Sequence, residues 1–233
     1  MPEDFHLERP LFGGALASTF PQRFQVFFFL FIYFILILSH NFFFFFLIGI
    51  WDAIFVQDVS NIREVPDHQE VFVDPSRDES LILEILELKE EVGDDGSASW
   101  FLQDLSSEQE AEGCVVIEQS GVTEAPGLCY KNTPAVITTA VGQMAISKGR
   151  QGREAQNFVR VYVANVRLKE VNTDILISAY EPIHINPLSD SATAVGAGVA
   201  TPAELSGCMP MVEVFKLAVS MFKVNNWGLF GSV

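Results

Sequence analysis

The sequence has few basic residues. Lysine and arginine together number 14 in 233 residues, against 30 aspartates and glutamates, so the formal net charge is −16. Nucleic-acid-binding proteins gather lysine and arginine against the phosphates, and this composition argues against that class. An acidic chain instead suits a basic protein surface as its partner, or is simply kept soluble by its charge. The length suits one domain, which can bury a core without disulfides or metals.

The patterns of common metal and catalytic sites are also missing. Cys114, Cys129 and Cys208 lie far apart, and none of the four histidines has a partner at metal-ligand spacing, so we predict no zinc site and no cofactor. There is no GKS or GKT phosphate loop and no GxSxG, and the run from Gly196 to Gly198 lacks the third glycine of a dinucleotide loop. A triad assembled in space stays open, but nothing points to an enzyme.

What the sequence does have is one long apolar run. Residues 26–51 read VFFFLFIYFILILSHNFFFFFLIGIW, and eleven of the 21 phenylalanines lie between residues 26 and 57. The length is sufficient for a membrane span. The run shows neither the two-residue nor the 3.6-residue period of an element with one buried face, so it does not read as part of a soluble core.

Two interpretations of residues 26–57 stay open. In the first, the segment is a retained intron: phenylalanine-rich runs are what T-rich noncoding sequence encodes, a valine codon begins with GT, and glutamine can be encoded by CAG. Excision would remove 32 codons in frame and join Gln25 to Asp58. In the second, the segment is a genuine membrane anchor, which would give a membrane location. We therefore divide the chain into 1–25, the insertion 26–57, and 58–233.

Residues 76–91 read as the clearest helix outside this run. Ser76 and Glu79 have the spacing of a capping box, and Gly93 would stop the helix. The apolar residues recur at spacings of four, three and four, at Leu81, Ile85, Leu88 and Val92. On such a helix Glu84, Glu87 and Glu91 would form a second, acidic stripe.

The remaining pattern predicts an α+β domain with a mostly antiparallel sheet. Strand-like runs occupy residues 70–73, 99–104, 114–119, 135–146, 158–169 and 174–180. Residues 171–173 predict a hairpin turn, and residues 10–21 an extended segment with a Gly-Gly bend. Residues 186–207 read mostly as a flexible excursion. Pro210 marks the start of a last helix to about residue 224, with a buried stripe at Val212, Phe215, Val219 and Phe222.

Several blocks resemble one known family. They are PLFGGA at 10–15, DVSNIREVPDHQEVFVDP at 58–75, DESLILEILEL at 78–88, VRLKEVNTDILISAYEP at 166–182 and the closing WGLF at 227–230. This set is similar to the Ran guanine nucleotide release factors, the Mog-type Ran-binding proteins, and to a plant-like member among them. The chain departs from the family at the insertion, and removing residues 26–57 restores the family's spacing.

The resemblance implies a sheet of about six mostly antiparallel strands flanked by helices, similar to PsbP-type proteins. It implies a monomeric regulatory protein, not an enzyme, that binds the small GTPase Ran, releases its nucleotide and acts in nuclear transport, in nucleus and cytoplasm. The family's acidic Ran contacts correspond to Asp67, Glu70, Glu84 and Glu87, and less directly to Asp58. If the predicted helix packs beside the preceding strand, these carboxylates share one face. Without the resemblance, a solvated face is the plainer interpretation of Glu84 and Glu87.

Two rival functions follow from the same residues. A membrane-anchored adaptor would carry the same domain on the apolar run. A chloroplast lumen protein that shares only the PsbP-like fold would need a transit peptide. Transit peptides are poor in acidic residues, whereas Glu3, Asp4 and Glu8 lie among the first nine residues, which argues against this second rival.

Overall fold

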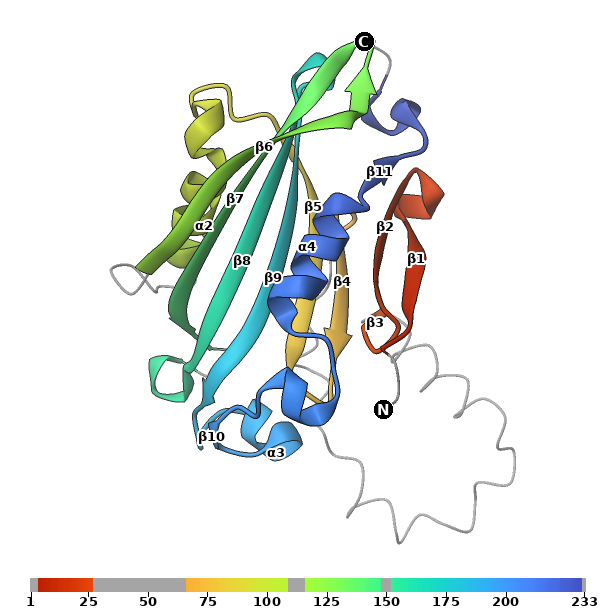
Figure 1. Ribbon diagram of the computed structural model, residues 1–233. Coiled ribbons are helices and arrows are strands. Elements are labelled where there is room, and N and C mark those ends of the chain that lie inside the picture. Colours follow the sequence, from red (N-terminus) through yellow and green to blue (C-terminus); the bar gives the residue numbers. More distant parts are fainter. Residues whose placement is uncertain (1–3, 27–65, 109–115, 148–151, 232–233) are drawn as a thin grey trace, which may run out of the picture.

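The structure of this chain is a computed structural model that describes residues 4–26, 66–108, 116–147 and 152–231 (Figure 1). Asp58, Cys114 and all of the apolar run except Val26 lie outside these ranges. Both interpretations of that run therefore stay predictions. No helix in the described part of the chain combines the length and apolar character that a membrane crossing requires.

A large antiparallel sheet forms the centre of the described chain. Its hydrogen-bonded neighbours follow the order β3, β4, β5, β9, β8, β7, β6, and β10 pairs with β9. The strands are β3 (Gln25–Val26), β4 (Gln69–Asp74), β5 (Glu79–Glu87), β6 (Val116–Tyr130), β7 (Thr133–Ile146), β8 (Asn157–Leu168), β9 (Thr173–Ile185) and β10 (Gly198–Val199). Because β3 and β10 have two residues each, six strands carry the sheet, as predicted.

A smaller sheet and three α-helices complete the described fold. The smaller sheet has β2 (Leu16–Pro21) between β1 (His6–Leu11) and β11 (Lys223–Val224). The helices are α2 (Ser97–Glu108), α3 (Ser191–Val195) and α4 (Met211–Ser220). Single 3-10 turns lie at η1 (Phe12–Gly14), η5 (Asp94–Gly96), η6 (Arg153–Ala155), η7 (Lys169–Val171), η8 (Ala203–Ser206) and η9 (Trp227–Phe230).

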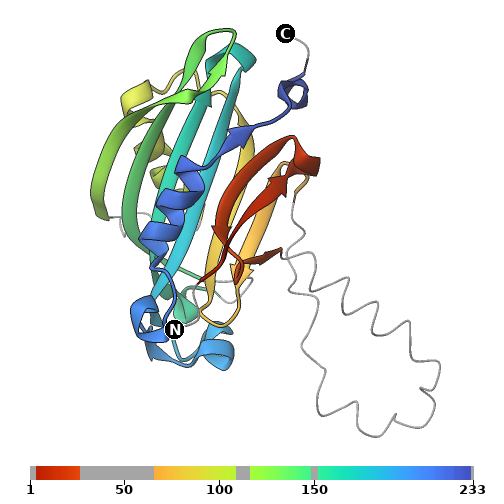
Figure 2. The ribbon, with the colours of Figure 1, turned by 45° about the vertical axis from the view of Figure 1, so that its right-hand side comes forward.

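These elements form three layers. Helix α2 packs on one face of the large sheet over β7 and β8, and α4 with the smaller sheet packs on the other, where α4 contacts β2, β8 and β9 (Figure 2). The predicted α+β class with a mostly antiparallel sheet is confirmed.

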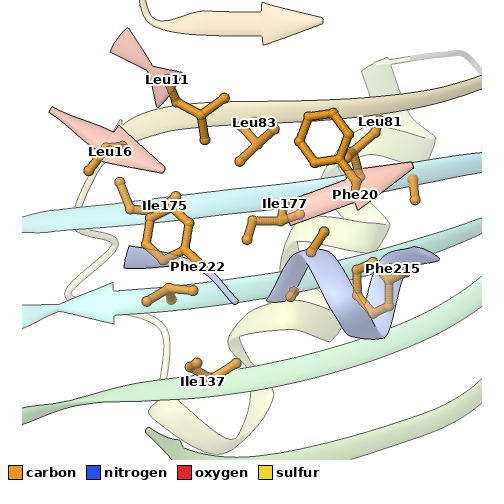
Figure 3. Close-up of a cluster of buried hydrophobic side chains, with 14 of the residues drawn as sticks. Leu11, Leu16, Phe20, Leu81, Leu83, Ile137, Ile175, Ile177, Phe215 and Phe222 are labelled. Atoms are coloured by element: carbon orange, nitrogen blue, oxygen red, sulfur yellow. The ribbon is translucent and has the colours of Figure 1, made fainter. Parts of the chain in front are cut away.

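The main core lies between the large sheet and the layer of α4 and β2. Leu16 and Phe20 from β2 meet Leu81 and Leu83 from β5, and Phe215 from α4 closes the side (Figure 3). Phe20 also stands edge-on to Phe72, with ring centroids 4.7 Å apart. A second core lies beneath α2, where Phe101 and Leu102 cover Val161 and Val163. Fully burying a side chain of this size stabilises the fold by roughly 1.5–3 kcal/mol.

The helix predicted at residues 76–91 is wrong, because most of this segment is strand β5. β5 is hydrogen-bonded to β4 on one side and to β9 on the other. Leu81 and Leu83 point into the main core, whereas Leu86 packs against the core under α2. Apolar residues on both faces hide a strand's alternation, so the helical spacing was coincidental. Pairing with two neighbours outweighs the helix preference of leucine and glutamate.

The expected capping box is a turn between two strands. The N–H and hydroxyl of Ser76 donate to Asp74 Oδ1 at 3.0 and 2.6 Å. The buried Glu79 carboxylate pairs with Arg77 at 2.8 Å and with Arg23 at 3.0 Å. Burial raises the pKa of Glu79, and the two guanidinium groups oppose that change.

The strand predicted at residues 99–104 is also wrong, because this segment belongs to α2. Trp100 and Phe101 have side chains that favour strands. The apolar positions that face the sheet nevertheless have the helical spacing of three, one and three: Ala98, Phe101 and Leu102 are buried, and Leu105 is partly buried. That spacing is visible in the sequence and predicts the helix correctly.

Residues 186–207, predicted as mostly a flexible excursion, hold α3, β10 and η8. The buried side chain of Asn157 fastens this segment to the start of β8. It donates to the hydroxyls of Ser189 and Ser191 at 2.9 and 3.0 Å and accepts from the N–H of Asn186 at 2.8 Å. The small, polar composition therefore reflects side-chain hydrogen bonding rather than a free linker.

Several other predictions are confirmed. β4, β7 and β9 include the predicted strands at 70–73, 135–146 and 174–180, and β8 includes the one at 158–169 except for Lys169, which begins η7. β8 and β9 form the predicted hairpin. The strand predicted at 114–119 falls partly in β6, which continues to Tyr130. The Gly-Gly bend joins β1 to β2, with φ of 67° and 89° at Gly13 and Gly14. Helix α4 follows Pro210 as predicted but ends at Ser220, and the last two residues of the predicted helix form β11. Of the predicted stripe, Phe215 and Phe222 are buried, whereas Val212 and Val219 are only partly buried.

We expect a chain that lacks residues 26–57 to fold. Gln25 pairs with Val73 at the sheet edge, so the described chain leaves and re-enters the domain beside β4. After deletion, residues 58–65 would still connect Gln25 to Pro66, and eight extended residues span up to about 26 Å. The gap between Gln25 and Pro66 is shorter than that. Gln25 lies opposite Val73, Gln69 lies about 13 Å from Val73 along β4, and a tight turn joins Gln69 to Pro66.

The measurement is thermal unfolding followed by circular dichroism. The deletion variant should unfold cooperatively, with a midpoint no lower than that of the full chain, and stay soluble without detergent. A variant without a cooperative transition would show that the domain needs the segment.

Candidate functional site

The described acidic residues of the predicted site lie at one end of the large sheet, where β4 begins and β5 ends. We call this the upper end, because it is uppermost in Figure 1. The opposite lower end holds α3 and η8. Asp67 is exposed in the turn before β4, and Glu84 and Glu87 belong to the last part of β5. Glu84 lies directly opposite Gln69, so the two stretches of chain are neighbours.

Glu84 is held by the start of β4. Gln69 Nε2 donates to Glu84 Oε1 at 2.6 Å, and His68 Nε2 lies 3.2 Å from the same oxygen. The Glu84 side chain is 15% exposed and that of His68 is 52% exposed. The Glu84 carboxylate is therefore positioned in advance, with one edge open to solvent. Sequence reasoning missed His68 and Gln69 because their contact depends on strand register.

Glu70 has a different environment. Its Oε1 accepts a 2.6 Å hydrogen bond from the N–H of Phe12, at the tip between β1 and β2. Phe12 has a left-handed φ of 48°, which a side chain as large as phenylalanine rarely adopts. Burial raises the pKa of Glu70, and the hydrogen bond from Phe12 opposes that change. Glu70 thus fastens the smaller sheet to the large one.

The carboxylates do not share one face as expected. In a strand, successive side chains point to opposite faces. Glu84 is level with Leu176, on the side of α2, whereas Glu87 follows Ile85 on the side of α4. Glu70, level with Leu83, also points to the α4 side. The acidic stripe depended on the incorrect helix. What Asp67, Glu84 and Glu87 share is an end of the sheet, not a face.

A buried ion pair supports the chain that follows Glu87. Arg167 and Asp174 are 2% and 0% exposed, and Arg167 Nε lies 3.1 Å from Asp174 Oδ1. The Arg167 guanidinium also donates to the carbonyls of Val92 and Lys89, each at 2.5 Å. These bonds fix residues 88–94 to the hairpin between β8 and β9. Two exposed acids on this segment, Glu90 and Glu91, are therefore held at the upper end as well.

The upper end offers little enclosed space. A cavity of about 10 Å³ lies between the β6–β7 turn and the β8–β9 turn. This is about the minimum for one water molecule and far too small for a nucleotide. Among the described residues no group of three or more histidine, cysteine, aspartate or glutamate side chains could hold a metal ion.

Comparison with known proteins supplies the family. The family model for "Ran-interacting Mog1 protein" matches residues 54–182, more than half of the chain. This chain belongs to the Mog1 family. The matched region of this Mog1-family chain includes all five predicted contact residues and excludes η9.

Individual relatives agree with this assignment. A Danio rerio protein named Ran guanine nucleotide release factor is 30% identical over 227 residues, covering 97% of this Mog1-family chain and 100% of the relative. The Schizosaccharomyces pombe nuclear import protein mog1 is 25% identical over 175 residues, covering 74% of this chain and 75% of the relative.

A solved structure shows the same fold. The crystal structure of the Saccharomyces cerevisiae Ran-binding protein Mog1p superimposes with a TM-score of 0.56 and 19% identity, covering 98% of this chain and 100% of that one. The resemblance stated from the sequence motifs is confirmed. The further likeness to PsbP-type proteins stays a prediction.

Proposed function

We propose that this Mog1-family protein binds the GTPase Ran and favours release of its guanine nucleotide, in support of nuclear protein transport. The observation that carries the proposal is the 30% identity to a relative named Ran guanine nucleotide release factor, across 97% of this chain. The name of the S. pombe relative, a nuclear import protein, supports the cellular role and a nuclear and cytoplasmic location. The protein acts as a regulatory binding partner, as a monomer and without a cofactor.

The contact residues proposed for Ran are Asp58, Asp67, Glu70, Glu84 and Glu87. Asp67 and Glu87 are exposed at the upper end, and Glu84 is held there by Gln69 with one edge open. Acidic side chains at the edge of an interface speed the encounter with a basic partner and fix its orientation. Glu70 contributes mainly by holding the tip between β1 and β2, since Phe12 occupies one carboxylate oxygen.

Nucleotide release sets a thermodynamic condition. A partner shifts an equilibrium only by its differential affinity, so this protein must bind nucleotide-free Ran more tightly than nucleotide-bound Ran. Each tenfold loss of nucleotide affinity requires about 1.4 kcal/mol of that preference. We propose that this protein meets that condition by holding a state of Ran that binds nucleotide weakly.

The test measures loss of a fluorescent guanine nucleotide from loaded Ran in the presence of excess unlabelled nucleotide. We expect the full-length chain to raise the release rate at least tenfold, with saturation as its concentration increases. A related small GTPase in place of Ran is the specificity control. Release at the intrinsic rate despite stable capture of Ran would reduce the function to binding alone. Absence of capture would refute the whole proposal.

A further inference from the structure

Three aromatic side chains meet at the upper end, on the α4 side. The ring centroids of Tyr130 and Trp227 are 4.7 Å apart, and those of Trp227 and Phe230 are 5.9 Å apart. Each of the three is only partly buried against the main core. Leu229, in the same turn η9, is 37% exposed. We call these four residues the aromatic platform.

The chain that leads into the platform is anchored to the smaller sheet. β11 pairs with β2 just before it. The N–H groups of Asn225 and Asn226 both donate to the carbonyl of Ala15, at 2.9 and 3.0 Å. The side chain of Asn226 then accepts a 2.9 Å hydrogen bond from the N–H of Gly228 and so caps η9. A surface ordered before binding loses little conformational freedom when a partner docks on it.

Acidic residues lie beside the platform. Trp227 and Glu170 both line the small cavity at the upper end. Thr133 Oγ1 donates to Glu170 Oε1 at 3.1 Å, which holds that carboxylate near the β6–β7 turn. Val171 lines the same cavity, and Thr173, two residues later at the start of β9, pairs with Glu87. Glu87 points to the same α4 side on which Trp227 packs.

We propose that the aromatic platform is the apolar centre of the surface that docks on Ran, with Glu87 and Glu170 at its rim. This inference rests on the proposed function and adds to it a part of the chain that lies outside the matched family region. Protein interfaces typically combine a few aromatic anchors with a charged rim. The partner's complementary patch would carry basic side chains opposite the carboxylates, with arginine or lysine stems able to lie on the aromatic rings.

The test uses full-length chains with one exposed leucine changed to lysine. Leu229→Lys places a positive charge on the platform. Leu188→Lys makes the same change at the lower end, where Leu188 is 69% exposed. We expect Leu229→Lys to weaken Ran binding at least tenfold in titration calorimetry, and Leu188→Lys to change it less than twofold. Trp227→Ala should weaken binding at least as much as Leu229→Lys.

Three results are informative. If Leu229→Lys and Leu188→Lys bind Ran with similar affinity, the aromatic platform is not part of the docking surface, although the proposed binding of Ran is unaffected. Failure of the wild-type chain to bind Ran removes the proposed function and the platform with it. If Trp227→Ala does not fold, Leu229→Lys decides, because the Leu229 side chain is not packed in the core.

A second measurement uses Leu229→Ala. Its loss of affinity for Ran should persist in 0.5 M salt, where the Debye length is about 4 Å, because that loss is apolar in origin.

Discussion

Reversing the charges of Glu84 and Glu87 to lysine should weaken the binding of Ran by about 100-fold, or roughly 2.7 kcal/mol. Each lysine would replace an attraction to a basic partner by a repulsion, and like charges brought together across an interface cost several kcal/mol. Glu87 is exposed and Glu84 keeps one open edge, so both can reach a docked partner. The measurement is the dissociation constant for Ran at fixed ionic strength.

The matched control reverses Glu154 and Glu204, two exposed residues at the lower end. The two double variants have the same net charge, so long-range attraction is equal and any difference reports local contact. The Glu84 change also removes the hydrogen bond from Gln69, so thermal unfolding of each variant must accompany the binding data. Equal affinities for the two doubles would exclude Glu84 and Glu87 as contacts.

The second large effect concerns stability. Asp174→Ala should lower the free energy of unfolding by about 3 kcal/mol, because it removes the buried carboxylate partner of Arg167 and leaves only the partly exposed Asp94, at 3.3 Å, to pair with that guanidinium. It also removes the acceptor of the N–H of Lys89, 3.0 Å from Asp174 Oδ2. Urea unfolding gives the difference if the slope with denaturant concentration is unchanged.

Lys169→Ala serves as the control for Asp174→Ala. It breaks an ion pair to Asp94 near the same segment, but the Lys169 side chain is 50% exposed. Exposed pairs contribute about 0–1 kcal/mol, so this variant should unfold almost like the wild type. If Asp174→Ala cost no more than Lys169→Ala, the buried pair would not be what fixes residues 88–94.

The central hairpins were predictable from local patterns. β8 alternates valine with arginine, tyrosine and alanine, which matches the two-residue period of a strand, and the turn around Asn172 lies between two such runs. Asn172 adopts φ of 51°, a left-handed value that asparagine tolerates well. Pro210 likewise marked the start of α4, because proline lacks the N–H that a helix interior requires.

The site was predictable only in its residue types. The acidic motif from Asp67 to Glu87 stood out in the sequence, but the direction of each carboxylate depends on whether its segment is a helix or a strand. Glu84 and Glu87 would be neighbours on a helix, and they point to opposite faces of β5. The partners of Glu84 depend on the pairing of Gln69 with Glu84, and the Arg167–Asp174 pair depends on the β8–β9 register. Register comes from tertiary pairing, which spacing along one segment does not contain.

The smaller sheet also bears on how the chain is made. β2 bonds to β11, and Ser18 Oγ donates to the carbonyl of Ala218, 200 residues further on, at 2.7 Å. Contacts between such distant residues slow folding, because a long loop must close before they form. During translation from the N-terminus, Leu16 and Phe20 lack the cover of α4 until about 200 further residues have been synthesised. Exposed apolar side chains promote aggregation, so this interval is the stage at which a newly made chain is most exposed to that risk.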